Sequence, residues 1–229
     1  MEMEITLPDE VPVMTLPGVA FFPQALMPLH IFEPRYRQML RDVLASNRLF
    51  AVAGIDPRQA RDATQFEPPH RVASVGIVRA CQENDNGTSN LLIQGLCRVE
   101  ISTIVTDEPY RRGRIRALTS QPGAPEPDNS ELRREIANLI TARVRLGAIP
   151  NCPIEMTKFI KGVEDAEAFS DIAAYSFCDD GKLKQKLLET LDVHRRLQLL
   201  RENILTDIED LKLLRKLQGP LDDENISDN

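Results

Sequence analysis

Residues 29–36 of this 229-residue chain read Leu-His-Ile-Phe-Glu-Pro-Arg-Tyr, and they join the end of an apolar segment to the start of a helix. Proline suits the first turn of a helix because its φ is fixed and its missing N–H would have no partner there. Glu33 places a carboxylate at the positive end of the helix dipole. Apolar residues recur with helical spacing at Tyr36, Met39, Leu40, Val43 and Leu44. The stretch therefore predicts a strand followed by an amphipathic helix, which we expect to stop near Asn47.

Strand-like segments surround this junction throughout residues 1–120. Expected strands cover residues 11–16, 19–22, 49–55, 72–81, 91–105 and 110–118. The sequence Asn-Asp-Asn-Gly at residues 84–87 predicts a tight turn between two of them. Gly95 lies inside a segment that is long for one straight strand, so it predicts a β-bulge or a barrel corner. Residues 1–120 are thus expected to form a β-rich barrel subdomain with one helix.

The pattern changes after residues 121–127, which contain three prolines and one glycine and predict a linker. Beyond this point the apolar residues follow the helical period of 3.6, so residues 128–219 are expected to form a helical bundle subdomain. Residues 220–229 are acidic and polar and are expected to be a disordered tail.

Aspartates at the starts of the helical segments predict N-caps, because a carboxylate accepts hydrogen bonds from free N–H groups of the first turn. Asp128 is expected to cap the first helix in capping-box fashion, and Asp192 the longest one. Asp179 and Asp180 are alternative caps for the helix that follows them and carries Leu183, Leu187, Leu188 and Leu191. Phe159 is expected to be buried by a short helix in the same bundle.

The composition favours a globular protein, with 42% hydrophobic and 28% charged residues. The four cysteines are scattered without a CxxC pair, which argues against a disulfide framework and against a zinc site. The net charge of −7 disfavours a nonspecific phosphate-binding surface. No stretch approaches the roughly 20 apolar residues of a membrane span and no signal-peptide pattern is present, so we expect a cytoplasmic protein without a membrane partner.

Several segments, taken in order, resemble the N-terminal domain of the Lon proteases. The matching segments are Leu16-Pro17, Phe22-Pro23, residues 28–36, Leu49-Phe50, residues 75–78, Asn86-Gly87, residues 91–99, residues 108–110, residues 169–174 and residues 184–197. Within them, residues 95–98 are similar to a Gly-Leu-x-Arg motif of that family and residues 169–174 to its Leu-Ala-Asp-Leu-Ile-Ala. Asp192, Val193, Arg196 and Leu197 resemble its Asp-Val-x-x-Arg-Leu.

This resemblance implies an α+β fold. The expected architecture is a partly open β-barrel of the Lon N-terminal type, loosely related to PUA domains, followed by an α-helical bundle. The family domain is the substrate-recognition module of Lon proteases and also occurs as a free-standing protein. The chain contains no G-x-x-x-x-G-K-[ST] phosphate loop. We therefore expect a non-enzymatic protein without cofactor that binds a polypeptide or protein partner, such as unfolded segments or a protease.

The expected contact surface combines an apolar groove between barrel and bundle with arginines that set the register of a bound chain. Its candidate peptide-binding residues are Phe21, Phe22, His30, Phe32, Glu33, Arg35 and Arg37. A structural explanation stays open for each of them, because aromatic residues beside a proline often belong to a core and a charged helix face is often only solvated.

Two other functions stay open. A nucleic-acid-binding PUA-like protein would present the alternating Arg112, Arg114 and Arg116, but the acidic charge and the aromatic content of 5% disfavour it. A cysteine-dependent hydrolase would use Cys97, beside Arg98, or Cys81. The sequence nominates no catalytic, cofactor-binding or metal-binding residue.

Overall fold

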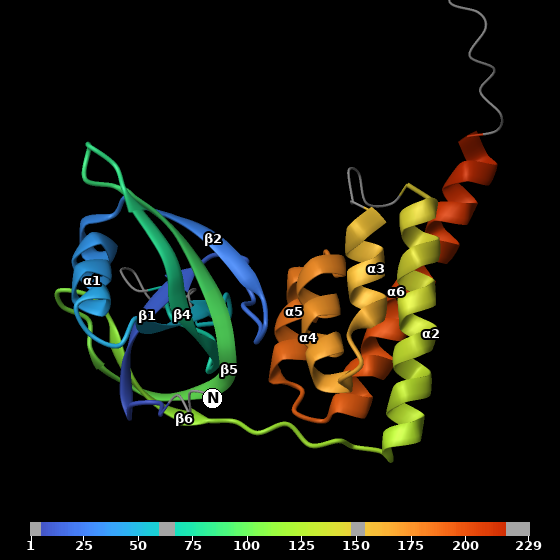
Figure 1. The fold of residues 1–229 in the computed structure, drawn as a ribbon, viewed down its shortest axis with the longest axis horizontal. Helices are drawn as coiled ribbons and strands as arrows, with labels where there is room; N and C mark the ends of the chain where they lie inside the picture. The colour runs from blue at the N-terminus through green and yellow to red at the C-terminus, as the bar shows by residue number, and fades with distance from the viewer. Residues whose placement is uncertain (1–5, 60–66, 148–153, 219–229) are drawn as a thin grey trace, which may run out of the picture.

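A computed structural model describes residues 6–59, 67–147 and 154–218, which form two lobes (Figure 1). The barrel lobe comprises β1 (Glu10–Leu16), β2 (Leu26–Ile31), α1 (Pro34–Leu44), β3 (Leu49–Gly54), β4 (Val72–Glu83), β5 (Ser89–Thr106) and β6 (Arg112–Ala117). The helical lobe comprises α2 (Glu126–Arg145), α3 (Ile154–Gly162), α4 (Ala166–Phe177), α5 (Gly181–Glu189) and α6 (Val193–Gln218). This confirms the α+β class. The predicted tail, residues 220–229, lies outside the described residues.

Five strands close into a ring, in which β1 pairs with β3, β3 with β4, β4 with β5, β5 with β6, and β6 again with β1. The long strand β5 has two successive partners on one side. Its residues 89–94 pair with β2, and its residues 99–106 pair with β6. The barrel is partly open because β5 leaves β6 halfway along its length.

The curled sheet buries side chains on both faces. The barrel interior is filled by Val11, Val13, Leu49, Ala51, Ala53, Ala73, Val75, Val99 and Ile101. These side chains are mostly small, as the narrow interior of a small barrel requires. The outer face carries larger residues and packs against α1 and the helical lobe, so one apolar cluster runs through both lobes.

Glycines in β4 and β5 allow residues 17–25 to cross the outer face at close range. A Cβ on Gly95 would lie 2.0 Å from the carbonyl oxygen of Phe22, and one on Gly76 would lie 2.8 Å from the ring of Phe21. The strand predicted at residues 19–22 is therefore wrong, because this segment packs across the sheet instead of joining it. The bulge predicted near Gly95 is confirmed by a register shift between the pairs Val75–Cys97 and Gly76–Gly95.

The helix starts were predicted with mixed success. Asp180 accepts from the Lys182 N–H at 2.8 Å and Asp192 from the Arg195 N–H at 2.8 Å, which confirms both caps. The cap predicted at Asp128 is wrong, since α2 already begins at Glu126, inside the predicted linker. Pro125 occupies the capping position there.

Two further local predictions are corrected by the structure. Helix α1 ends at Leu44, and the left-handed residue after it is Arg48 (φ 63°), not Asn47. Asn47 instead accepts a hydrogen bond from the Leu49 N–H through its side chain. Phe159, which was expected to be buried, is 56% exposed on α3.

We predict that Gly95→Ala destabilises the protein by at least about 2 kcal/mol. The new methyl group would overlap the backbone of Phe22 and Pro23, and a backbone segment can shift only together with the residues bonded to it. Gly162→Ala is the matched control, since its Cβ would meet nothing within 4 Å. Urea unfolding followed by circular dichroism measures both variants. Equal unfolding midpoints for the two would contradict the close packing of residues 17–25 on β5.

Candidate functional site

The first two predicted contact residues, Phe21 and Phe22, lie in the core. They are 1% and 0% exposed, and the Ser74 hydroxyl donates to the Phe21 carbonyl at 2.6 Å. Phe22 also lies beneath the guanidinium of Arg98, 5.8 Å from its ring centre. Both residues are therefore corrected from contact surface to core, because the segment that carries them crosses the outer face of the sheet.

His30 and Phe32, by contrast, are exposed where β2 ends. Phe32 is 61% exposed, and its ring stacks on the His30 imidazole with centroids 6.1 Å apart. The His30 Nδ1 lies 2.7 Å from the Asn90 side-chain oxygen on β5. This bond and the stacking hold both rings at the outer end of β2.

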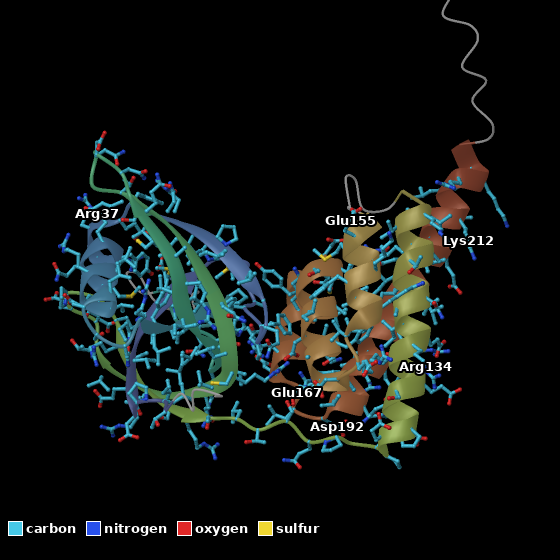
Figure 2. The ribbon with its side chains drawn as sticks, viewed as in Figure 1. Arg37, Arg134, Glu155, Glu167, Asp192 and Lys212 are labelled. Atoms are coloured by element: carbon cyan, nitrogen blue, oxygen red, sulfur yellow. The ribbon has the colours of Figure 1, made fainter. Side chains whose placement is uncertain are left out.

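The charged candidates at the start of α1 make their contacts within the barrel lobe. Arg35 donates to Glu33 at 2.9 Å and to Glu67 at 3.0 Å, and its guanidinium lies over the ring of Tyr36. Arg37 covers the hairpin turn, on the outer side of the barrel lobe and far from the lobe junction (Figure 2). The predicted surface therefore does not form one continuous patch.

A different surface unites the exposed candidates with residues that sequence reasoning missed. Directly opposite residues of antiparallel strands share a face. Three such rows cross β2, β5 and β4: Leu26–Gln94–Ile77, Pro28–Leu92–Ala80 and His30–Asn90–Gln82. We call these nine residues the open face. None of them carries a carboxylate, ammonium or guanidinium group, and Leu26 is 52% exposed.

The open face continues the sheet side that lines the barrel interior, beyond the point where the barrel ends. Ile77 packs against the interior cluster at this boundary. The opposite side of β2 is covered, since Met27 and Ile31 are buried. A proline inside an apolar strand marks an edge strand, so Pro28 was the sequence signal for this surface.

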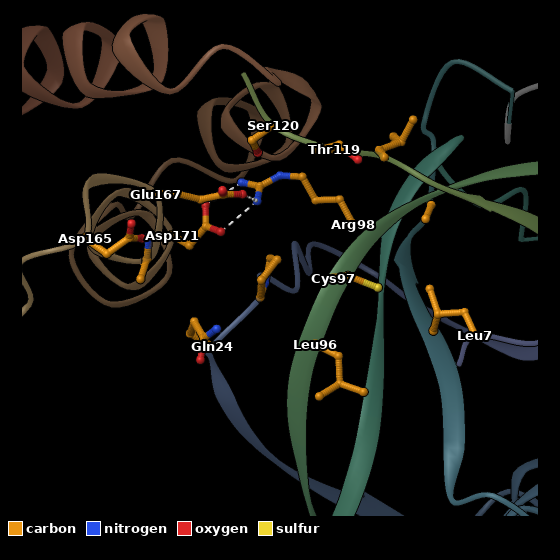
Figure 3. Close-up of a pocket in the computed structure, with 14 residues that line it drawn as sticks. Leu7, Gln24, Leu96, Cys97, Arg98, Thr119, Ser120, Asp165, Glu167 and Asp171 are labelled. Atoms are coloured by element: carbon orange, nitrogen blue, oxygen red, sulfur yellow. Dashed lines mark hydrogen bonds and ion pairs between the residues drawn. The ribbon is translucent and has the colours of Figure 1, made fainter. Parts of the chain in front are cut away.

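A cleft of about 580 Å³ lies beside the open face, where the two lobes meet (Figure 3). It is lined by Leu7, Pro23, Gln24, residues 96–98 and residues 117–120 of the barrel side, and by Asp165, Glu167, Ala168 and Asp171 of α4 and its cap. It opens where β5 changes partner from β2 to β6. Gln24 and Leu96 line the cleft. Leu26 and Gln94, which lie two residues from them in the chain, belong to the open face.

Two buried arginines share one buried carboxylate at the cleft floor. Arg98 of β5 forms a bidentate ion pair with Asp171 of α4, with one bond of 2.7 Å. Arg196 of α6 donates to the same carboxylate and, at 2.7 Å, to the Ser120 hydroxyl. Glu167 lies 3.9 Å from Arg98 and 3.7 Å from Arg196. All three members of the triad Arg98, Asp171 and Arg196 are at most 2% exposed.

The electrostatics of the floor follow from this burial. Burial lowers the pKa of Arg196, Asp171 opposes the effect, and the neighbouring Arg98 adds to it. Burial also raises the pKa of the Cys97 thiol, which makes the thiolate less available at neutral pH. Cys81 lies opposite Leu91, and Cys97 opposite Val75, so these cysteines do not face each other across the hairpin.

The described residues also bear on metal, membrane and nucleic-acid binding. Within residues 6–59, 67–147 and 154–218, no three His, Cys, Asp or Glu side chains are grouped to hold a metal ion. None of the helices in these residues combines the length and the hydrophobicity of a membrane span. The arginines of β6 have acidic neighbours, since Arg114 pairs with Glu10 at 3.1 Å and Arg116 with Glu100 at 2.6 Å.

Comparison with known proteins relates these features to a family. Residues 10–205 match the sequence family described as the ATP-dependent protease La (LON) substrate-binding domain. The Lon protease of Desulfosudis oleivorans is 25% identical over 221 residues, and that of Dictyoglomus thermophilum is 26% identical over 220 residues. Each alignment covers 95% of this chain but only 26% and 27% of the relative. The chain thus spans about a quarter of the length of these curated relatives.

Solved structures share the fold. The N-terminal domain of a Mycobacterium avium complex Lon protease superposes with a TM-score of 0.65 at 17% identity, over 88% of this chain and 98% of that one. A Lon N-terminal domain protein from Xanthomonas campestris gives a TM-score of 0.60 at 21% identity, over 84% and 97%.

We predict that Asp171→Asn destabilises the protein by about 3–5 kcal/mol, because it leaves two buried guanidinium groups with only the half-exposed Glu167, 3.7–3.9 Å away, as counter-charge. Glu167→Gln is the control, since a half-exposed carboxylate beyond hydrogen-bond distance contributes at most about 1 kcal/mol. Chemical denaturation at one pH compares them. Similar losses in both variants would show that Asp171 is not the main counter-charge.

We also predict slow alkylation of Cys97 at pH 7 in the folded protein, because its raised pKa and partial burial reduce the reactive thiolate. Iodoacetamide labelling followed by peptide mass spectrometry measures the rate, with urea-unfolded protein as reference. Faster labelling in the folded state would instead indicate an activated thiol, as a cysteine-dependent hydrolase requires.

Proposed function

Because this chain belongs to the ATP-dependent protease La (LON) substrate-binding domain family, we propose that it binds polypeptide and catalyses no reaction itself. The observation that carries the proposal is the open face, a partly apolar sheet surface at the edge of the barrel whose nine residues include no carboxylate, ammonium or guanidinium group. Such a surface gains free energy when apolar side chains of another chain cover it.

The chemistry of the open face favours polypeptide over nucleic acid. It presents hydrocarbon from Leu26, Pro28 and Leu92 beside neutral amides of Gln94 and Asn90. Phosphate-binding surfaces combine several cations, whereas the nine residues of the open face carry none. Arg79 beside them adds one guanidinium, which donates to the neutral Gln94 amide at 2.7 Å. Phe32 extends the same surface beyond the end of β2.

The cleft adds polar groups at one end of the open face. At its mouth, Asp165 and Glu167 provide exposed or half-exposed carboxylates, while Arg98 is committed to Asp171. A bound segment would therefore place apolar side chains on the open face and polar groups toward the lobe junction. This arrangement keeps the contact surface near the expected groove between barrel and bundle, but without Phe21 and Phe22, which are buried.

Unfolded segments of other proteins are the partners that this surface suits, because unfolded chains expose apolar residues in an extended form. A protease that receives such segments is a second partner consistent with the family. The cytoplasm remains the predicted location, and the described cysteines are free thiols, as its reducing conditions require.

We predict that Leu26→Ser and Phe32→Ser each weaken polypeptide binding roughly 5- to 30-fold, the loss of about 1–2 kcal/mol of apolar contact. Val105→Ser is the matched control, because Val105 is 48% exposed on a different part of β5. Fluorescence anisotropy with labelled, reduced and carboxymethylated lactalbumin measures the dissociation constants. An effect of Val105→Ser as large as the others, or no binding by the unaltered protein, would contradict the proposal.

A further inference from the structure

The free edge of β2 carries unpaired backbone groups. Among the described strands, β2 pairs only with β5. The Gly95 N–H donates to the Ala25 carbonyl at 2.9 Å. This bond determines which residues of β2 point their backbone groups toward β5. Because bonded and non-bonded pairs alternate in an antiparallel ladder, Met27, Leu29 and Ile31 direct their backbone groups to β5. The intervening residues Leu26, Pro28 and His30 direct theirs away from it.

Two observations agree with this alternation of backbone directions along β2. Pro28 has no N–H and stands where none is needed for the β5 ladder. The Leu26 carbonyl, which points away from β5, accepts from the Tyr175 hydroxyl of α4 at 3.4 Å. Four backbone groups of the edge then remain without a partner in the described part of the chain: the N–H groups of Leu26 and His30 and the carbonyls of Pro28 and His30.

We infer that β2 binds its polypeptide ligand by strand addition, with an extended segment pairing along the edge from Leu26 to His30. This inference rests on the proposed function and names its binding mode. An extended backbone is the chemical complement of this edge, since it carries donors and acceptors at the repeat of a strand. Its side chains on one side would lie beside Leu26, Pro28, His30 and Phe32, next to the open face.

The edge is less suited to a second copy of this chain. An antiparallel, two-fold symmetric pair of β2 strands would bring two Pro28 residues into one short ladder, and each would remove a donor. A foreign segment without proline meets only one missing donor. The occupant is therefore an extended segment of another polypeptide, and Pro28 limits the strength of its pairing.

The test compares variants at one position of the edge that keep or remove a backbone donor. His30→Pro removes the His30 N–H, whereas His30→Ala keeps it, and both lose the side-chain bond to Asn90. With a fluorescein-labelled, uncharged and proline-free apolar decapeptide, His30→Pro should bind roughly three- to tenfold more weakly than His30→Ala. Pro28→Val adds a donor and should bind the same peptide tighter than the unaltered protein by a similar factor.

Amide hydrogen exchange supplies a readout on the unaltered protein, which holds even if His30→Pro does not fold. Peptide should slow exchange at the His30 amide, while the Leu29 and Ile31 amides, already bonded to β5, should change little. Equal affinities of His30→Pro and His30→Ala, with peptide still bound, would overturn strand addition and leave the proposed function standing. No peptide binding by the unaltered protein would remove both. A dimer of the unaltered protein that peptide dissociates would make a second copy the occupant and overturn the inference.

Discussion

The carboxylate of Asp171 is the shared partner of two buried guanidinium groups, with Glu167 beside them as a second acid, and the arrangement of the two lobes depends on this contact. Arg98 comes from β5 of the barrel lobe and Arg196 from α6 of the helical lobe. Buried charges are tolerated only when they are paired and hydrogen-bonded. The bidentate geometry of the Arg98 pair also restricts direction, so few orientations of the helical lobe satisfy all three groups. The continuous apolar cluster supplies attraction between the lobes, and the triad supplies orientation.

That orientation shapes the candidate binding surface. It brings α4 against the start of β2, where Tyr175 donates to the Leu26 carbonyl, and it forms the cleft beside Gln24 and Leu96. The open face is thereby bounded by the lobe junction at one end and free at the other, near Phe32. A binding surface on a strand that other strands and a second lobe hold in place is better ordered than one on a loop.

Sequence reasoning succeeded where the signal was local. Proline at the first turn predicted the start of α1, the caps at Asp180 and Asp192 were identified from residue type, and Gly95 predicted an irregularity in β5. It did not predict whether an individual apolar residue is buried or exposed. Phe22 was a candidate for the contact surface, with a core position left open, and it lies in the core, while Phe159 was expected in the core and is exposed. Periodicity shows that a residue is apolar and on which face it lies, but not what covers that face.

The sequence by itself determined the α+β class, the family, and the motifs that contribute Arg98, Asp171 and Arg196 to one site. These follow from residue types at short spacing, which the chain carries whatever its final shape. Only the tertiary structure decided that the three side chains meet, that residues 17–25 cross the sheet, and that β2 is left with a free edge. Each of these depends on contacts between segments distant in the chain, and their partners are chosen by packing and charge balance, which no local pattern encodes.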